Sequence, residues 1–325
     1  PQGSVLGPLL FLILVLDINE DIVNSSIGSF ADDTKLWNAI KSIIDQHQLQ
    51  KDLNSIYHWA EINNMTLNSD KFYHLAFSPN SDSPTYLKPS NDPIPTVPCT
   101  KDLGLLVQDN LQFTQHIATL AARANRISGW SLRTIHSRST FVMKTLLKQV
   151  IICLQEYASC IWCPHDQHQI NILEQVQRLF TKKFSIFLIY DPITNIPYCN
   201  TSYPERLKRL NLFSLQRRRE RFIMMYMHKV TLDPKLMPSV TVDNNVRTKV
   251  HLKPTTSPKN TPTWIKKIRE FSIFSVGPKL YNSLPKELRQ LQMSPQEFKC
   301  KLDKYLSTIP DLPGTTRNSL LNMCQ

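Results

Sequence analysis

The sequence predicts an α+β fold: an antiparallel sheet with helices, then a mostly helical region, then a small C-terminal module. Two observations predict it. Apolar residues recur with a period of two in short segments before about residue 113, and with the helical period of 3.6 after it. Residues 234–262 contain five prolines and little periodicity, which is typical of a linker. We therefore expect domains at 1–112, 113–233 and 234–325.

The N-terminal region alternates predicted helices and strands. Pro8 stands near the first turn of a helix, where a missing N–H costs little. Ser42 with Asp45 forms the pattern of a capping box, which marks the start of a second helix. The expected elements are a helix over 8–22, strands over 26–30 and 34–37, a helix over 43–62, a strand over 71–78, a loop or loose hairpin over 78–99 and a strand over 101–107.

The region after residue 113 reads as helices. The stripe from Met143 to Ile161 alternates in steps of four and three, which is the spacing of one helix face. Ser202 with Glu205, and Pro204 between them, marks another helix start. Helices are expected near 115–135, 143–161, 167–185 and 204–231.

The net charge of +12 is unevenly distributed. Residues 1–115 hold 6 Lys and Arg against 13 Asp and Glu, residues 116–235 hold 18 against 7, and residues 236–325 hold 14 against 6. An acidic N-terminal part before two basic parts suits a metal site beside a surface that binds a polyanion. A basic solvated face without a partner is the alternative.

Basic residues crowd one short region of the helical part. Phosphate contacts from such residues position a duplex without reading its sequence. They predict a surface that binds nucleic acid. The residues are Arg206, Lys208, Arg209, Arg217, Arg218, Arg219 and Arg221.

The cysteines and the apolar segments limit the class of protein. Seven scattered cysteines argue against a disulfide framework and for a reducing compartment. The apolar run from Val5 to Ile18 contains a Gly and a Pro and is shorter than the roughly 20 residues that span a bilayer, so no membrane partner is expected. Cys160, Cys163, His165 and His168 suggest a zinc site, but the second ligand pair follows too closely to form a finger.

Between the first two strands stands the segment Phe30-Ala31-Asp32-Asp33. A tight turn can present both carboxylates to one side, and divalent cations supply the charge that two neighbouring carboxylates need. Mg²⁺ prefers one or two carboxylates together with substrate phosphates. In a two-metal site the ions lie about 3.5–4 Å apart and clamp the attacking and leaving oxygens. A plain surface turn is the alternative, because Asp is a common turn residue.

Several motifs, in order and with matching spacing, carry a family resemblance. Pro-Gln-Gly-Ser-Val-Leu-Gly-Pro-Leu-Leu-Phe opens the chain, and Phe-Ala-Asp-Asp-Thr-Lys-Leu follows about twenty residues later. Together they resemble the reverse transcriptase of LINE-type (non-LTR) retrotransposons. The resemblance is strong over 1–115 and diffuse to about 306. Its further motifs are Asn68-Ser69-Asp70-Lys71, Lys101-Asp102-Leu103-Gly104, Glu156-Tyr157-Ala158-Ser159, Trp162-Cys163-Pro164 and Asn282-Ser283-Leu284-Pro285.

The resemblance implies a fold and a reaction. The fold would be a partial right-hand polymerase palm, followed by a helical thumb and a small module. The reaction would be RNA-directed DNA synthesis, in which a DNA primer is extended on an RNA template with deoxynucleotide triphosphates and two Mg²⁺ ions. In cells the family implies a nuclear or cytoplasmic ribonucleoprotein.

The resemblance also implies roles for single residues. Asp32 and Asp33 would hold the metal ions, and Lys71 would neutralise or protonate the leaving pyrophosphate. Gln2 and Gly3 would lie beside the template strand and the incoming nucleotide, with Phe30 and Ala31 also at the substrate. Lys101 belongs to a stretch similar to the family's primer grip, which would hold the primer end against the acid pair.

The polymerase palm also needs a carboxylate from an earlier strand, together with the fingers, and we expect both before Pro1. The chain alone is therefore expected to be inactive. Three alternatives stay open: a non-catalytic nucleic-acid-binding remnant, a decayed copy of the element, and an intron-encoded maturase. The Lys-Asp-Leu-Gly and Asn-Ser-Leu-Pro patterns speak against the maturase.

Overall fold

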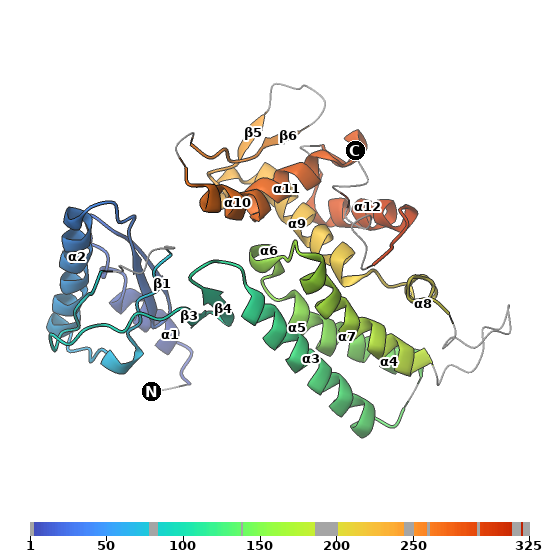
Figure 1. Ribbon diagram of the computed structural model, residues 1–325, viewed down its shortest axis with the longest axis horizontal. Coiled ribbons are helices and arrows are strands. Elements are labelled where there is room, and N and C mark those ends of the chain that lie inside the picture. The colour runs from blue at the N-terminus through green and yellow to red at the C-terminus, as the bar shows by residue number, and fades with distance from the viewer. Residues whose placement is uncertain are drawn as a thin grey trace. The chain divides into compact units, whose positions relative to one another are not determined.

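The computed structural model describes residues 3–77, 84–137, 139–185, 201–243, 250–258, 261–290, 293–313 and 320. It forms two compact units, Pro1–Leu111 and Gln112–Gln325, called here the N-terminal and C-terminal units (Figure 1). Helices combine with two-stranded antiparallel sheets, as the predicted α+β class requires. The palm and thumb arrangement and the three domain boundaries stay predictions. No helix among the described residues is long and apolar enough to cross a membrane.

The described residues of the N-terminal unit form two α-helices and two hairpins. The hairpins are separate two-stranded antiparallel sheets, β1–β2 and β3–β4. The bounds are α1 Gly7–Leu14, β1 Ser26–Phe30, β2 Asp33–Trp37, α2 Ile43–Ile62, β3 Cys99–Asp102 and β4 Leu105–Gln108.

Helix α1 is shorter than the expected 8–22. It ends at Leu14, and turns closed by i+3 hydrogen bonds continue to Ile22. Acidic side chains at Asp17, Glu20 and Asp21 oppose the negative end of a helix dipole, which accounts for the early end. None of the residues of α1 is buried, although all of them are apolar or Gly and Pro.

Helix α2 has the bounds that its periodicity predicted. The capping box is confirmed: Ser42 Oγ accepts from the amide of Asp45, and the Asp45 carboxylate accepts from the amide of Ser42 at 2.8 Å. The buried face carries Ile56 and Ala60. Buried Asp52 accepts from the amide of Asn24 at 2.9 Å, so α2 fixes the segment that leads into the first hairpin.

Two predicted strands are wrong. Over 71–78 the described residues form a 3₁₀ turn, Ser69–Lys71, and a single bridge from His74 to Thr96. The Asn68 side chain accepts from the amide of Asp70 at 3.2 Å, which favours a turn over a strand. The strand expected over 101–107 is the hairpin β3–β4. Leu103 and Gly104 both have positive φ, 43° and 87°, as a two-residue hairpin turn needs.

The C-terminal unit is mainly helical. Helix α3 packs along α7, and α9 packs against α7, α11 and α12 (Figure 1). The bounds are α3 Thr114–Thr134, α4 Thr140–Leu146, a π-helical turn Leu147–Ile152, α5 Cys153–Glu156, α6 Ser159–Trp162, α7 Gln167–Ser185, α8 Tyr203–Arg209, α9 Leu215–Leu232, β5 Thr241–Asp243, β6 His251–Lys253, α10 Thr263–Phe271, α11 Ile273–Asn282 and α12 Pro295–Thr308.

Two predicted long helices are interrupted. The helix expected over 143–161 passes through the π-helical turn and breaks at Ala158, whose φ is 50°. The indole N–H of Trp162 donates to the carbonyl of Tyr157 at 2.8 Å and closes the break. The helix expected over 204–231 is divided into α8 and α9, because Ser214 caps a new helix by accepting from the amide of Arg217 at 3.1 Å.

A hydrophobic core joins α9 to the residues after 234. Met224, Met227 and Val230 pack in one cluster with Leu280, Tyr281, Phe298 and Leu302. Gly277 allows the close approach of α11, since a Cβ there would lie 2.7 Å from the Met227 sulfur. The C-terminal module is therefore packed on α9 through a shared core.

His228 lies at the centre of this core and is 0% exposed. Its Nε2–H donates to the carbonyl of Met293 at 2.9 Å, and its ring stacks on Phe298 with a centroid distance of 4.1 Å. Nδ1 faces the hydroxyl of Tyr281 at 3.4 Å and accepts from it. Both ring nitrogens are thus used in the neutral form, and burial lowers the pKa of His228.

The C-terminal unit should lose stability on acidification. A histidine with a lowered pKa contributes stability that is present above its unfolded value of about 6.5 and is lost as pH falls. Burial also lowers the pKa of His116 and His165, which adds to the effect. Thermal unfolding of the chain at pH 7.5 and 5.5 measures it. His228→Gln should reduce the difference in midpoint between the two pH values, whereas His136→Gln, at an exposed position, should leave it unchanged.

Candidate functional site

The acid pair lies at the tip of the β1–β2 hairpin. Ala31 and Asp32 form the two-residue connection, and Asp33 begins β2 opposite Phe30. Both acidic residues are exposed. The hairpin prediction is confirmed, and the acid pair sits at its turn. Next to it, the hydroxyls of Ser29 and Thr34 lie 3.2 Å apart across the strands.

The turn of this hairpin includes one residue in the left-handed region. Ala31 has a φ of 53°, in the left-handed region that costs a residue with a Cβ roughly 1–2 kcal/mol. A positive φ at the first position of a two-residue hairpin turn suits the twist of the flanking strands, and Leu103 has one at the same position of the β3–β4 turn. Further along the hairpin, a Cβ on Gly28 would lie 3.2 Å from the Trp37 ring. The Trp37 ring can therefore pack over Gly28 because this residue has no side chain.

An ion pair joins the acid-pair hairpin to the second hairpin. Lys35 of β2 pairs with Asp102 of β3, and the side chains are 42% and 35% exposed. An exposed ion pair adds little stability, but this one places the Lys101–Gly104 motif beside the strand that follows the acid pair. Sequence reasoning named Lys101 and missed Lys35 and Asp102. The available signal was the opposite charge of the two residues in two neighbouring motifs.

The remaining predicted substrate residues that the structure describes come from separate segments of the N-terminal unit. Lys71 is exposed and ends a 3₁₀ turn, and Lys101 is exposed in β3 opposite Leu106. Phe30 is 65% exposed at the hairpin tip. Gly3 is exposed, with a φ of 86°. Gln2 lies outside the described residues.

The carboxylates fit part of a magnesium site. Mg²⁺ is often held by one or two protein carboxylates and completes its shell with water and phosphate oxygens. Asp32 and Asp33 supply two such groups from one turn. Within the described ranges, no group of three or more His, Cys, Asp or Glu side chains lies close enough to hold a metal ion.

Three of the arginines expected to contact phosphate are buried, which corrects that expectation. Arg206, Arg217 and Arg219 are 5%, 0% and 1% exposed. Arg206 donates to the carbonyl of Thr201 at 2.7 Å, and Arg217 donates to the carbonyl of Pro310 at 3.0 Å. Side chains that are enclosed in this way cannot reach a phosphate without unpacking the helices.

The other three arginines are paired with acids, which also gives them a structural role. Arg221 holds the carboxylate of Asp303 with two N–H groups, one of them at 2.8 Å. Arg209 donates to the Glu205 carboxylate at 2.9 Å. Arg218 holds the carboxylate of Glu156 with two N–H groups, one of them at 2.8 Å. The Glu156-Tyr157-Ala158-Ser159 motif therefore supplies an anchor for α9. The sequence does not show which arginines are exposed to solvent, so it could not distinguish these paired arginines from arginines that are free to bind phosphate.

A buried polar network joins α7, α8 and α9. The Tyr203 hydroxyl donates to Glu174 at 2.8 Å, and the amide of Gln216 donates to the same carboxylate at 2.7 Å. Burial raises the pKa of Glu174, while the nearby Arg219 guanidinium acts in the opposite direction. Burial also raises the pKa of Tyr203 well above its usual value. Arg219 is thus buried in the helical bundle close enough to Glu174 to act on its pKa.

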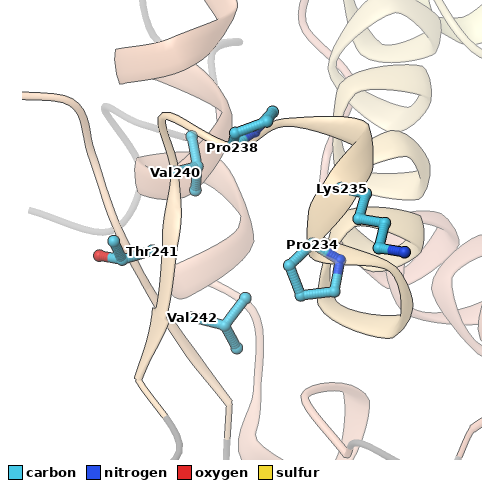
Figure 2. Close-up of a pocket in the computed structure, with 6 residues that line it drawn as sticks. All are labelled: Pro234, Lys235, Pro238, Val240, Thr241 and Val242. Atoms are coloured by element: carbon cyan, nitrogen blue, oxygen red, sulfur yellow. The ribbon is translucent and has the colours of Figure 1, made fainter.

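Two other features of the C-terminal unit, the cysteine pair Cys160 and Cys163 and a surface groove, offer little support for a reactive site. Burial raises the pKa of Cys160 to about 11 and that of Cys163 in the same direction. In the part of the chain that the structure describes, these cysteines do not belong to any group of three or more His, Cys, Asp or Glu that could hold a metal ion. An open groove, shown in Figure 2, has no acid, histidine or cysteine in its lining. The groove is lined by Pro234, Lys235, Pro238, Val240, Thr241 and Val242.

Comparison with known proteins identifies relatives. No family model and no solved structure matches this chain. The chain is 27% identical over 193 residues to "Probable RNA-directed DNA polymerase from transposon X-element" of Drosophila melanogaster. This match covers 56% of the chain and 21% of the relative. It is 30% identical over 131 residues to "RNA-directed DNA polymerase from mobile element jockey" of the same species. That match covers 37% of the chain and 14% of the relative.

The matched part of the chain thus spans about a fifth of the first relative and a seventh of the second. The resemblance that the motifs indicated is confirmed at this level. The homologues of this chain are RNA-directed DNA polymerases of Drosophila non-LTR retrotransposons, at modest identity over part of its length.

Proposed function

We propose that this chain is part of an RNA-directed DNA polymerase of a non-LTR retrotransposon, which extends a DNA primer on an RNA template. The observation that carries the proposal is the β1–β2 hairpin, which displays Asp32 and Asp33 at an exposed turn. The two relatives have names that state this activity. Their modest identity supports the general function, and the roles of single residues below are part of the proposal.

Asp32 and Asp33 are proposed to hold the Mg²⁺ ions together with the phosphates of the deoxynucleotide. Bound Mg²⁺ supplies charge neutralisation at the phosphates and makes a primer hydroxyl a better nucleophile. The exposure of both carboxylates supports this role, because they are open to a ligand. The turn also fixes them next to each other, so that neither has to be brought in by a loop movement.

The β3–β4 hairpin is proposed to hold the primer end. The Lys35–Asp102 ion pair supports this, since it connects that hairpin to the strand that begins with Asp33. Lys101 would meet a primer phosphate and Lys71 the leaving pyrophosphate. Gln2, Gly3, Phe30 and Ala31 would lie at the template and the incoming nucleotide, as in the family that the motifs resemble.

The proposal includes further polypeptide beyond these 325 residues. Two-metal phosphoryl transfer needs a protein anchor on both sides of the metal pair, and Asp32 and Asp33 approach from one turn. Misplacement of the reacting atoms by about 1 Å can cost 10²-fold in rate. We therefore propose that a carboxylate on another strand, together with the fingers, completes the site, and that the chain alone is inactive.

Primer extension tests this proposal. With an RNA template, a DNA primer, Mg²⁺ and deoxynucleotides, the chain alone should give background incorporation. Adding a polypeptide that carries the fingers and the first catalytic strand, taken from the X-element relative, should raise it. Robust extension by the chain alone would contradict the need for the second part. No extension by the combined proteins, both shown to be folded, would contradict the polymerase proposal.

A further inference from the structure

The first helix of the C-terminal unit is free of acidic residues. From residue 110 to residue 155 the sequence contains no Asp or Glu, while it contains six Arg and Lys. Three of these, Arg123, Arg126 and Arg133, lie on α3. All three are exposed, and none makes an ion pair with another described residue. The positive charge of α3 is therefore not neutralised by the surrounding described side chains.

The arginines of α3 share one face. The buried face carries Ile117, Ala121, Ala124, Ser128 and Ser131, which pack toward α7 and α5. With 3.6 residues per turn, positions 123, 126, 130 and 133 fall on the opposite side of the helix. In Figure 1, α3 lies at an edge of the helical part of the C-terminal unit, and the side chains at these four positions are exposed.

An exposed tryptophan interrupts this basic stripe. Trp130 follows Arg126 by four residues and precedes Arg133 by three, and it is 57% exposed. A large aromatic side chain is not needed on the solvent side of a helix for packing. Proteins that bind single-stranded nucleic acid combine a basic track for the backbone with aromatic side chains on which bases stack. The stripe from Arg123 to Arg133 is about 15 Å long, which is enough for a few nucleotides.

We propose that the outer face of α3, formed by Arg123, Arg126, Trp130 and Arg133, binds single-stranded nucleic acid. The three guanidinium groups contact successive phosphates, and one unpaired base stacks on the Trp130 indole. The identity of the strand rests on the proposed function, under which it is an unpaired stretch of RNA template or of displaced DNA. The buried arginines of α8 and α9 take no part, because they are enclosed in the bundle.

A single strand fits this face better than a duplex or a protein. In a duplex the bases are stacked on one another, so an indole finds no free base face. A protein partner would have to bring acidic groups to three arginines and an apolar pocket to Trp130. A single-stranded nucleic acid supplies both partners along one chain, because its phosphates pair with arginines and its flat bases stack on an indole.

The test is binding of the full chain to a labelled 20-nucleotide RNA, the same sequence as DNA, and the matching duplex, measured by fluorescence anisotropy at several salt concentrations. Trp130→Ala should weaken binding of the single strands by about fivefold to over a hundredfold and leave the duplex unchanged. Replacing Arg123, Arg126 and Arg133 together by Ala should reduce the slope of log K against log salt by about 2 for the single strands. Comparison of RNA with DNA identifies the preferred strand.

A charge-matched control separates the site from general attraction. Lys279, Lys286 and Lys304 are exposed, and replacing them by Ala removes the same charge from the same unit. This control should leave the single-strand slope within about half a unit of wild type. Equal losses in the control and in the α3 variant, or an equal effect of Trp130→Ala on duplex and single strand, would overturn the proposal. So would binding of protein or lipid vesicles in place of nucleic acid. Failure of primer extension with intact α3 binding would refute only the polymerase function.

Discussion

Asp32→Asn should lower primer extension at least about 100-fold in the polymerase completed by its second part. The substitution keeps the size of the side chain and removes the negative charge that a divalent cation needs. A reacting group displaced by about 1 Å can lose 10²-fold in rate, and loss of a metal anchor displaces both the nucleotide and the primer hydroxyl. Asp33→Asn should have an effect of similar size, because the two residues are adjacent on one turn.

The control for this prediction is Asp21→Asn. Asp21 is exposed in the same unit and carries the same charge, but it lies in the turns after α1. Its replacement should change extension less than about twofold, the range of ordinary surface substitutions. Loss of activity in Asp21→Asn, with Asp32→Asn near wild type, would show that the metal ions are held elsewhere and that the hairpin is a plain turn.

Arg219→Ala should destabilise the C-terminal unit by about 3–5 kcal/mol. Arg219 is 1% exposed and is the cation near buried Glu174, which also holds the Tyr203 hydroxyl and the Gln216 amide. Removing this fully buried side chain leaves a cavity between the helices and takes away a positive charge that acts on the buried Glu174 carboxylate. For a unit of this size each kcal/mol shifts Tm by about 2–4 °C. Thermal and urea unfolding measure the change.

Two further variants make this prediction specific. Arg219→Met fills the space and should recover part of the stability when combined with Glu174→Gln, because the charge is then removed from both partners. Lys208→Ala, at an exposed position of α8, should change the free energy of unfolding by less than about 0.5 kcal/mol. A stable Arg219→Ala variant that binds nucleic acid more weakly would restore the phosphate-contact role that burial argues against.

The elements that the sequence predicted well depend on local signals. The capping box of Ser42 and Asp45 and the helical stripe of 43–62 act within one segment, and α2 has the expected bounds. The β1–β2 hairpin follows from two short strands and a paired acid. The two incorrect strands depended on turn chemistry that periodicity does not report. Leu103 adopts a positive φ, which is rare for a side chain of that kind.

The arginine cluster shows what the sequence does not contain. Arg217, Arg218 and Arg219 are adjacent, so on a helix they must point in three directions, and the sequence alone does not state which directions are covered. The core that covers α9 on a second side comes from residues 280–306, far along the chain. By contrast, α3 is covered on one side, and its basic face stays open. A count of charges cannot separate these two cases.

The residues of the candidate site could be predicted from the motifs, but the contacts between them could not. The order of the motifs indicated a polymerase and named Asp32 and Asp33. The ion pair between Lys35 and Asp102 depends on the register of two hairpins, each set by a two-residue turn. A shift of one residue in either hairpin would turn these side chains to opposite faces, so the contact could be found only once both registers were known.

Metal binding at the hairpin tests the central claim most directly, because it needs no second polypeptide. Mn²⁺ can replace Mg²⁺ at oxygen ligands and broadens the NMR signals of nearby amides. With a deoxynucleotide present, small amounts of Mn²⁺ should broaden the amide signals of Ala31, Asp32, Asp33 and Thr34 in the full chain, and excess Mg²⁺ should restore them. Broadening centred on Asp17, Glu20 and Asp21 with the hairpin unaffected, or no broadening at the hairpin at any Mn²⁺ level, would contradict the account.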